Sequence, residues 1–243
     1  MQKSKYRLEA CFSPALYPYR QIEDAFNLVV IDVLRATTSI CAAFQNGVES
    51  IIPVATIEEA KEYKRKGYMV ASERDGQVLD FADFGNSAFN FMQDGLQGVE
   101  IVYSTTNGTQ AMQLAPENGK MVIGAFSNLT ALKDWLINQK CDVLFLCSGW
   151  KNKFNLEDTL FVGALAELIL AEDIDFYSQC DSVMAAIDLW KTAKSDVLGY
   201  IEKAAHRHRL KKLGLDDVLE FSFTMDTCPV VPVLEGERLV KIR

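Results

Sequence analysis

Short apolar runs alternate with amphipathic segments along most of this chain. The apolar runs predict strands near residues 7–12, 28–32, 49–54, 68–72, 100–103, 121–124 and 142–147. Helices are predicted between them at 36–44, 57–66, 106–114, 128–137 and 158–171. The last of these helices is mostly apolar and is therefore expected to be buried. Alternation of this kind is typical of a layered α/β domain.

The pattern changes after Ser178, where helical segments continue through Leu219. Two strand-like runs, 230–234 and 238–242, then flank a turn at Glu235-Gly236. No linker rich in Pro, Gly or Ser marks a boundary, and no internal repeat is visible. We therefore expect a single domain over residues 1–243, with 175–180 as a candidate point of subdivision. Its predicted build is a layered α/β domain around a mostly parallel or mixed sheet, with a helical C-terminal elaboration.

Composition restricts the classes of partner. The 243 residues are 49% hydrophobic and 24% charged, as in an ordinary globular protein, and the net charge is −8. That charge argues against broad contact with nucleic acid or an acidic membrane, so an anionic substrate would need a local positive site. The six cysteines form no Cys-x-x-Cys pair, which favours free thiols and a cytoplasmic location. The first ten residues are too polar for a signal peptide, and no apolar segment approaches the roughly 18 residues that would span a bilayer.

Residues 28–38 (LVVIDVLRATT) place an acid, a cation and two hydroxyls where an apolar strand gives way to a helix. Asp32 is near the carboxyl end of the strand, where open α/β sheets bind their ligands. Arg35 could hold two phosphate oxygens, and Thr37 and Thr38 open the helix. The alternative is a salt-bridged strand end with a threonine as helix cap.

Similar polar clusters follow other predicted strands. Glu73 and Arg74 lie in a turn, with Asn86 and Ser87 a few residues later. The segment STTNGT at 104–109 could hold an oxyanion through backbone N–H groups and side-chain donors, or could simply be a well-capped helix start. Its candidate ligands are Thr105, Thr106, Asn107, Gly108 and Thr109. Ser127 and Asn128 form a weaker example, for which a helix cap is the favoured interpretation.

Glu157 and Asp158 open a helix after a strand and a polar loop. Adjacent carboxylates there could bind Mg²⁺, which takes oxygen ligands, or could be an acidic first turn favoured by the helix dipole. Taken alone, the pair favours the acidic first turn. Recurrence of polar clusters at five strand ends shifts the balance towards a ligand site, because such sites are assembled from several loops.

Several common chemistries lack their signatures. The sequence contains no Gly-x-x-x-x-Gly-Lys-Ser/Thr loop and no Gly-x-Gly-x-x-Gly. Cys147 is followed six positions later by Lys153 rather than an arginine, and Asp32 is followed two positions later by Leu34 rather than a second acid. The only histidines, His206 and His208, lie in the basic stretch HRHRLKK. We predict surface charge for both, with phosphate or sulfonate contact as the alternative.

Five short segments, in this order and spacing, resemble the 2-phosphosulfolactate phosphatase family. They are DVLRATT at 32–38, Glu73-Arg74, Asn86-Ser87, TTNGT at 105–109 and Glu157-Asp158, and the resemblance continues into HRHRL and Val231-Pro232. It covers most of the chain. Ala71-Ser72 stands where the family tends to have glycines, and Ala88 where it usually has proline, which affects loop geometry more than chemistry.

The resemblance implies a Mg²⁺-dependent phosphomonoester hydrolase of three-layer α/β/α build. Such an enzyme releases phosphate from (2R)-2-phospho-3-sulfolactate to give 3-sulfolactate, a step toward coenzyme M. The expected catalytic residues are Asp32, Arg35, Glu73 and Arg74, and the expected metal ligands are Asp32, Glu157 and Asp158. The expected substrate-binding residues are Thr37, Thr38, Asn86, Ser87, Thr105, Thr106, Asn107, Gly108, Thr109, Ser127 and Asn128.

Three questions stay open at this point. Asp32 could be a metal ligand or a phosphorylated nucleophile. The substrate could instead be another small phosphorylated hydroxy acid, or the chain could bind an anion without catalysis. A homodimer is expected only because two-fold oligomers are common.

Overall fold

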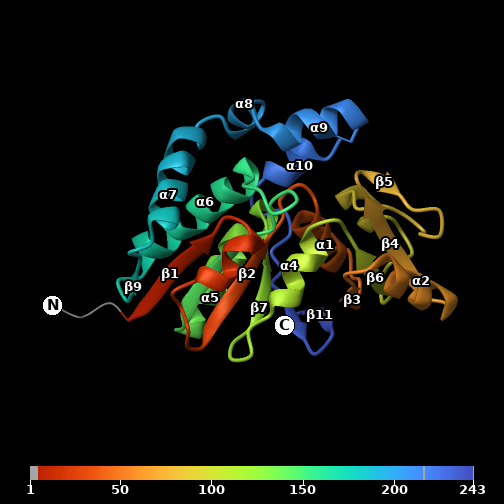
Figure 1. Cartoon of the computed structure of the whole chain (residues 1–243), viewed down its shortest axis with the longest axis horizontal. Helices are drawn as coiled ribbons and strands as arrows, with labels where there is room; N and C mark the ends of the chain where they lie inside the picture. Colours follow the sequence, from red (N-terminus) through yellow and green to blue (C-terminus); the bar gives the residue numbers. More distant parts are fainter. Residues whose placement is uncertain (1–4, 216, 243) are drawn as a thin grey trace.

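The computed structural model describes residues 5–215 and 217–242. Within these residues, eleven strands form one sheet in the order β5-β4-β6-β3-β11-β10-β7-β2-β8-β1-β9 (Figure 1). The strand bounds are β1 Tyr6–Cys11, β2 Phe26–Ile31, β3 Ser50–Pro53, β4 Met69–Arg74, β5 Gln77–Val78, β6 Glu100–Ser104, β7 Met121–Gly124, β8 Asp142–Cys147, β9 Phe176–Tyr177, β10 Pro232–Glu235 and β11 Arg238–Lys241.

The α-helices are distributed over both faces and one edge of the sheet (Figure 1). Their bounds are α1 Ala36–Gln45, α2 Ile57–Arg65, α3 Ala88–Phe91, α4 Gly108–Ala111, α5 Leu129–Gln139, α6 Leu156–Glu172, α7 Asp181–Ala193, α8 Val197–Ile201, α9 Ala205–Leu213 and α10 Leu219–Phe223. Short 3₁₀ helices occupy Pro14–Tyr19, Met112–Leu114 and Phe126–Asn128. Helices α8, α9 and α10 lie together at the top of the view in Figure 1.

The sheet consists of two parallel sets joined by a hairpin, with the short strand β5 antiparallel to β4 at one edge. Strands β7, β2, β8, β1 and β9 form one set, and β3, β6 and β4 form the other. The C-terminal hairpin β10–β11 lies between them and is antiparallel to both. Val233 pairs with Val122 of one set and Leu239 with Ile51 of the other. The hairpin thus joins the two parallel sets into one continuous sheet.

Side chains of β2 alternate between the two faces of the sheet, as a fully buried strand requires. Val29 and Ile31 join the core formed with α5, α6 and α7. Leu28 and Val30 join the core around α1, which also contains Ile51 and residues of β6. Helix α1 therefore packs against both parallel sets, and a smaller core lies under α2. The result is the predicted α/β/α layering around a mixed sheet.

The predicted elements agree with the structure, including the strands at both sides of Glu235-Gly236. The helix expected at 106–114 is shorter, since α4 begins at Gly108 and gives way to a 3₁₀ turn at Met112. Short elements were not predicted, namely the 3₁₀ helix 14–19, β5, α3 and β9. Two to six residues are too few to produce a recognisable hydrophobic period.

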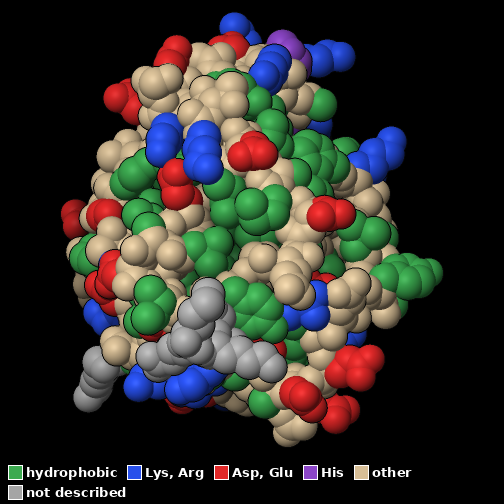
Figure 2. Space-filling view, turned by 90° about the vertical axis from the view of Figure 1, so that its left-hand side faces the viewer, with side chains coloured by type: hydrophobic (Ala, Val, Ile, Leu, Met, Phe, Trp, Pro, Cys, Tyr) green, Lys and Arg blue, Asp and Glu red, His purple; other side chains and the backbone are tan. Residues whose placement is uncertain are grey.

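Charges of both signs are mixed on the face that carries α7 and β9 (Figure 2). Among the described residues, no helix is both long enough and apolar enough to cross a membrane.

Candidate active site

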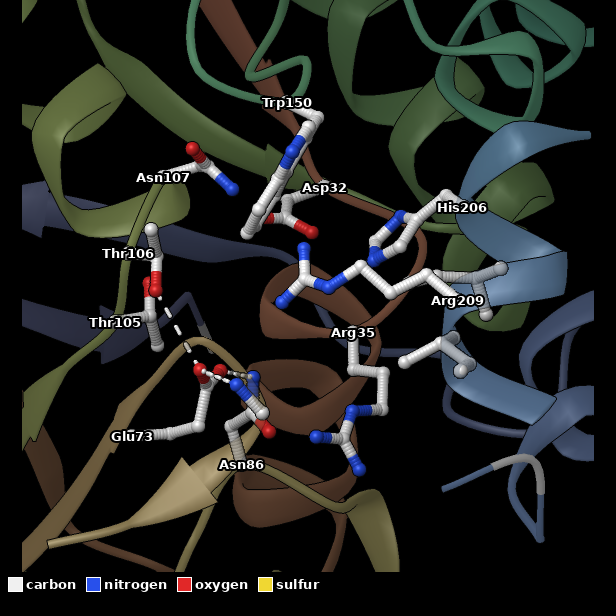
Figure 3. A pocket seen from close by; sticks show the side chains of 13 residues that line it. Asp32, Arg35, Glu73, Asn86, Thr105, Thr106, Asn107, Trp150, His206 and Arg209 are labelled. Atoms are coloured by element: carbon white, nitrogen blue, oxygen red, sulfur yellow. Dashed lines mark hydrogen bonds between the residues drawn. The ribbon is translucent and has the colours of Figure 1, made fainter. Parts of the chain in front are cut away.

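A small pocket gathers side chains from both parallel sets and from the C-terminal helices (Figure 3). Its volume is about 340 Å³, including the part open to solvent. The lining residues come from several segments of the chain. These are the β2–α1 loop, β4 with the β4–β5 turn, the residues just before α3, the β6–α4 loop, the loop after β8, and α9. The residues are Asp32, Leu34, Arg35, Glu73, Gly76, Asn86, Thr105, Thr106, Asn107, Trp150, His206, Arg209 and Leu210.

The turn after β2 holds Asp32 in a fixed orientation. The Asp32 N–H donates to Thr37 Oγ1 at 3.1 Å, and the Thr37 N–H donates to the Asp32 carbonyl at 2.9 Å. The Ala36 N–H approaches Asp32 Oδ1 at 3.4 Å, and Thr38 Oγ1 donates to the Val33 carbonyl at 2.9 Å. Thr37 and Thr38, which were expected to bind substrate, are thus buried outside the pocket lining and bonded to the backbone. Their visible role is to shape the turn that presents Asp32.

Burial makes Asp32 an unusual acid. Its side chain lies in a low-dielectric surrounding that disfavours the charged form and raises its pKa to about 6. Glu157 and Glu73 raise this pKa further, while His206 lowers it. Asp32 is therefore part of a cluster of acids that opposes its ionisation unless a cation is nearby.

Glu157 and Asp158 lie directly behind the pocket, fully buried. Glu157 Oε1 is 2.7 Å from His206 Nδ1, whereas Glu157 Oε2 is buried without a partner among the described residues. Asp158 accepts hydrogen bonds from the Val33 N–H at 3.0 Å and the Gly149 N–H at 3.2 Å. Burial, together with the charges of Glu157 and Asp32, raises the Asp158 pKa well above its usual range. Asp158 therefore connects the β2–α1 and β8–α6 loops.

The arrangement of Asp32, Glu157 and Asp158 suits a divalent cation that keeps several water ligands better than a metal ion bound by protein side chains alone. No group of three His, Cys, Asp or Glu side chains converges on a point in residues 5–215 and 217–242. Mg²⁺ does not need such a group, since one or two carboxylates plus water and substrate oxygens complete its shell. Asp32 and the unpartnered Glu157 Oε2 satisfy that need, whereas both oxygens of Asp158 already accept backbone hydrogen bonds.

Glu73 ties three segments of the pocket together. Its Oε1 accepts from the Gly76 N–H at 2.5 Å and lies 3.4 Å from Thr106 Oγ1, and its Oε2 accepts from Asn86 Nδ2 at 2.8 Å. Arg74, expected to be catalytic, is outside the pocket lining. Its guanidinium donates to the Glu73 carbonyl at 2.7 Å and to Ser104 Oγ at 2.8 Å. These bonds anchor Arg74 to the sheet.

Two arginines of the pocket form no ion pair with an acid among the described residues. Arg35, which follows a cis peptide bond, is 5% exposed, and its guanidinium makes no hydrogen bond or ion pair with the described residues. The Arg209 guanidinium stacks on Trp150 with its carbon 3.4 Å from the ring centroid, and its Nη1 is buried without a partner in the described chain. Burial lowers the Arg209 pKa. Buried, unpaired guanidinium groups at a pocket are suited to hold anionic groups of a ligand.

The loop after β6 approaches Asp32 closely. Thr105 and Thr109 exchange hydrogen bonds between their hydroxyls and N–H groups at 3.2 and 3.3 Å, which fixes the loop. Asn107 Oδ1 accepts from the Lys151 N–H at 3.1 Å. A Cβ on Gly108 would lie 2.9 Å from Asp32 Oδ2 and 2.7 Å from Ala36 Cβ, so only glycine allows this approach. Thr105, Thr106 and Asn107 line the pocket, with Gly108 and Thr109 behind them.

The remaining predicted ligands lie elsewhere. Asn128 accepts from the Ala125 N–H at 3.0 Å and donates to the carbonyls of Ile123 and Val230 at 3.0 and 2.9 Å. Ser127 is fully buried and does not line the pocket. Asn128 thus secures the end of β7, although its side chain makes no capping hydrogen bond to α5. Ser87 lines a neighbouring hollow together with Asn86.

The sequence did not predict that Trp150, His206 and Arg209 would line the pocket. The surface role predicted for His206 is wrong, because its side chain is only 10% exposed and contacts Glu157. His208 is exposed, as predicted. The available signal was the helical spacing of residues 206, 209 and 210, which places them on one face of α9.

A mixed α/β fold that presents buried acids and unpaired arginines in one small pocket is typical of proteins that act on small anionic substrates. The chain belongs to the 2-phosphosulpholactate phosphatase family, whose sequence model matches residues 11–237. This confirms the predicted family and the class of phosphoric monoester hydrolases.

Curated relatives carry the same name, probable 2-phosphosulfolactate phosphatase. The protein from Thermotoga maritima is 35% identical over 206 residues, which cover 85% of this chain and 88% of the relative. The protein from Caldanaerobacter subterraneus is 32% identical, covering 86% and 88%. The Synechocystis protein is 33% identical, covering 90% and 92%.

Proposed function

We propose that this chain hydrolyses (2R)-2-phospho-3-sulfolactate to (2R)-3-sulfolactate and inorganic phosphate. The observation that carries the proposal is a small pocket in which two unpaired arginines, Arg35 and Arg209, lie with the buried acid Asp32. A substrate with phosphate, sulfonate and carboxylate groups brings several negative charges. In a chain with net charge −8, such a ligand needs the local positive charge that the arginines provide.

The pocket's own residues would bind and orient the substrate. The guanidinium groups can each donate two parallel hydrogen bonds to an anionic group. Thr105, Thr106 and Asn107 supply further donors on the opposite wall, and Glu73 holds that wall against Asn86. Fixed donors that need no reorganisation stabilise the charge that develops during phosphoryl transfer.

Mg²⁺ is part of the proposal. Asp32 and Glu157 would hold the ion, with Asp158 orienting the loops from behind. When bound, the ion neutralises phosphate charge and lowers the pKa of a coordinated water. Burial, together with the charges of Glu157 and Glu73, raises the pKa of Asp32 in the absence of a cation, which supports a cationic partner at this position. Asp32 as the nucleophile stays the alternative role.

The proposed product, 3-sulfolactate, would serve as a precursor of coenzyme M. This part of the proposal is supported by the family resemblance rather than by the shape of the pocket.

The test is phosphate release by the purified protein from phosphosulfolactate and from phospholactate, which lacks the sulfonate. Each substrate is assayed with Mg²⁺, with excess chelator, and with Mg²⁺ restored. We expect metal-dependent release that strongly favours phosphosulfolactate. Equal rates would indicate a broader phosphatase, release that survives the chelator would remove Mg²⁺ from the proposal, and no release from either substrate would favour a binding protein.

A further inference from the structure

A second hollow adjoins the pocket at Arg35. It shares Arg35, Glu73, Gly76 and Asn86 with the pocket and extends between the β4–β5 turn, α3 and the end of α9. We call it the Ser87 hollow; its further lining residues are Val78, Gly85, Ser87, Asn90, Gly214, Leu215 and Asp217. Figure 3 shows the Arg35 side chain extending away from Asp32, in the direction of Asn86.

The polar groups of the Ser87 hollow suit an anion. Arg35 is nine-tenths buried and its guanidinium has no hydrogen-bond or ion-pair partner in the described chain, and Ser87 Oγ is buried without a hydrogen-bond partner there. Asn90 adds a carboxamide. Leaving such donors buried and unpaired is costly, so a ligand that accepts their hydrogen bonds is strongly favoured.

No acid that borders the hollow forms an ion pair with Arg35 among the described residues. Both oxygens of Glu73 already accept hydrogen bonds, from Gly76 and Asn86. Asp217 is exposed, so solvent screens its charge. Asn86 presents an acceptor, because its Nδ2 is bonded to Glu73, and is therefore not one of the anion-holding groups.

The absence of a side chain at Gly85 leaves room for the ligand in the Ser87 hollow. A Cβ there would lie 2.8 Å from Val78 Cγ2 and 4.0 Å from Asn90 Oδ1. A glycine thus lets the chain between β5 and α3 approach Val78 without a side chain entering the hollow.

We propose that the Ser87 hollow binds the second, non-reacting anion of the substrate, a sulfonate, while Arg209 on Trp150 binds the phosphoryl group. The assignment rests on the proposed function. Arg209 lies on Trp150, whereas Figure 3 shows Arg35 at the Asn86 end of the pocket. In phosphosulfolactate an oxygen and two carbons separate phosphorus from sulfur, so one small molecule can reach both positions. Ser87 and Asn90 then determine specificity.

The experiment measures kcat/KM for phosphosulfolactate and phospholactate in each of several variants. Ser87→Ala and Asn90→Asp are expected to lower the ratio of the two values by about tenfold or more, mainly through the KM for phosphosulfolactate. Asn90→Asp is the stronger test, because it keeps the side chain's shape and places a negative charge beside the sulfonate. Arg209→Lys should lower both values together and leave their ratio unchanged. Asn138→Ala, on the exposed side of α5, is the matched control.

An unchanged ratio in both hollow variants, measured on protein with wild-type circular dichroism, overturns the assignment while the phosphatase proposal stands. If the ratio of the kcat/KM values changes in Arg209→Lys instead, the two assignments are reversed, with the sulfonate at Arg209 and the phosphoryl group at the Ser87 hollow. The proposed function itself fails only if the wild-type protein releases no phosphate from phosphosulfolactate, so the two failures are distinguishable.

Discussion

The buried position of Asp32 lowers the stability of the folded protein at neutral pH. Its pKa in the folded protein is about 6, against 3.8 for an ordinary aspartate, and burial is the main cause. Between these two pH values the folded state binds the proton more tightly than the unfolded state. The free energy of unfolding therefore falls as pH rises through this window. Residues with a catalytic or binding task commonly impose such a cost.

Asp32→Asn is accordingly expected to stabilise the metal-free protein at neutral pH. Without metal, the variant should melt several degrees higher than the wild type at pH 7.5, about 3–8 °C, and the difference should vanish near pH 4. The measurement is thermal unfolding in the presence of a chelator across pH 4–8. Asp80→Asn, an exposed position, serves as the control. A variant that melts below the wild type at pH 7.5 would contradict the buried-charge explanation.

Substitution of Gly108 tests whether the close approach of the β6–α4 loop to the β2–α1 loop is needed for activity. Alanine would place a methyl group 2.9 Å from Asp32 Oδ2 and 2.7 Å from Ala36 Cβ, so one loop must move. Because a displacement of about 1 Å can reduce catalysis by about 100-fold, we expect Gly108→Ala to lower kcat/KM by about 10- to 100-fold. Gly67→Asn is the control, since Gly67 follows α2 in a left-handed conformation that Asn tolerates. Wild-type activity in Gly108→Ala would mean that this spacing is not needed.

At the scale of elements, α9 completes the pocket from outside the sheet. It brings His206 to Glu157 at the start of α6 and Arg209 onto Trp150 in the β8–α6 loop. Trp150 also stacks with His206, with ring centroids 5.9 Å apart. One aromatic side chain thus supports the two basic residues that α9 brings to the pocket.

Trp150→Ala should therefore weaken substrate binding more than it weakens folding. Loss of the stacking surface leaves Arg209 free to adopt other rotamers, and we expect KM to rise about tenfold. Trp150→Phe keeps a ring under the guanidinium and should retain most of the affinity. The measurement is steady-state kinetics of both variants with melting temperatures beside them. An unchanged KM in Trp150→Ala would separate Arg209 from substrate binding.

Local signals in the sequence were sufficient for most elements and for the loops that bear Asp32 and Thr105 to Asn107. They could not distinguish a ligand from a cap, because Ser, Thr and Asn serve both purposes at helix starts. Thr37, Thr38 and Asn128 bond to the backbone in the structure, although their sequence context matches that of the pocket residues. His206 was missed for another reason, since its burial depends on the packing of α9 against a loop distant in sequence.

At the scale of the whole molecule, the C-terminal hairpin holds the two parallel sets in one sheet. The strands of the hairpin were predictable from their apolar runs, but their position in the centre of the sheet was not. Pairing between β10 and β7, and between β11 and β3, joins segments more than 100 residues apart. The pocket takes Asp32 from one set and Glu73 from the other, so its assembly depends on this hairpin.

Leu239→Ala tests that dependence. Leu239 is fully buried in the α1 core, and its truncation should cost about 2–4 kcal/mol of unfolding free energy. Lys241→Ala, at an exposed position of the same strand, should change it by less than about 0.5 kcal/mol. Urea unfolding followed by circular dichroism is the measurement, and a single domain predicts one transition. Two separate transitions, or equal effects of both substitutions, would argue against a hairpin that unites the fold.

A cytoplasmic location and a homodimer stay predictions from the sequence. The proposed activity at this pocket is open to a more direct test, because Asp32 lines the pocket and can be replaced without changing its neighbours.

The decisive measurement is phosphate release from phosphosulfolactate, with Mg²⁺, by the wild-type protein and Asp32→Asn side by side. We predict that the wild type turns over and that Asp32→Asn loses activity by about 100- to 10,000-fold while keeping its circular dichroism spectrum. A folded Asp32→Asn protein with wild-type turnover would remove Asp32 from catalysis and contradict the assignment of the active site to this pocket.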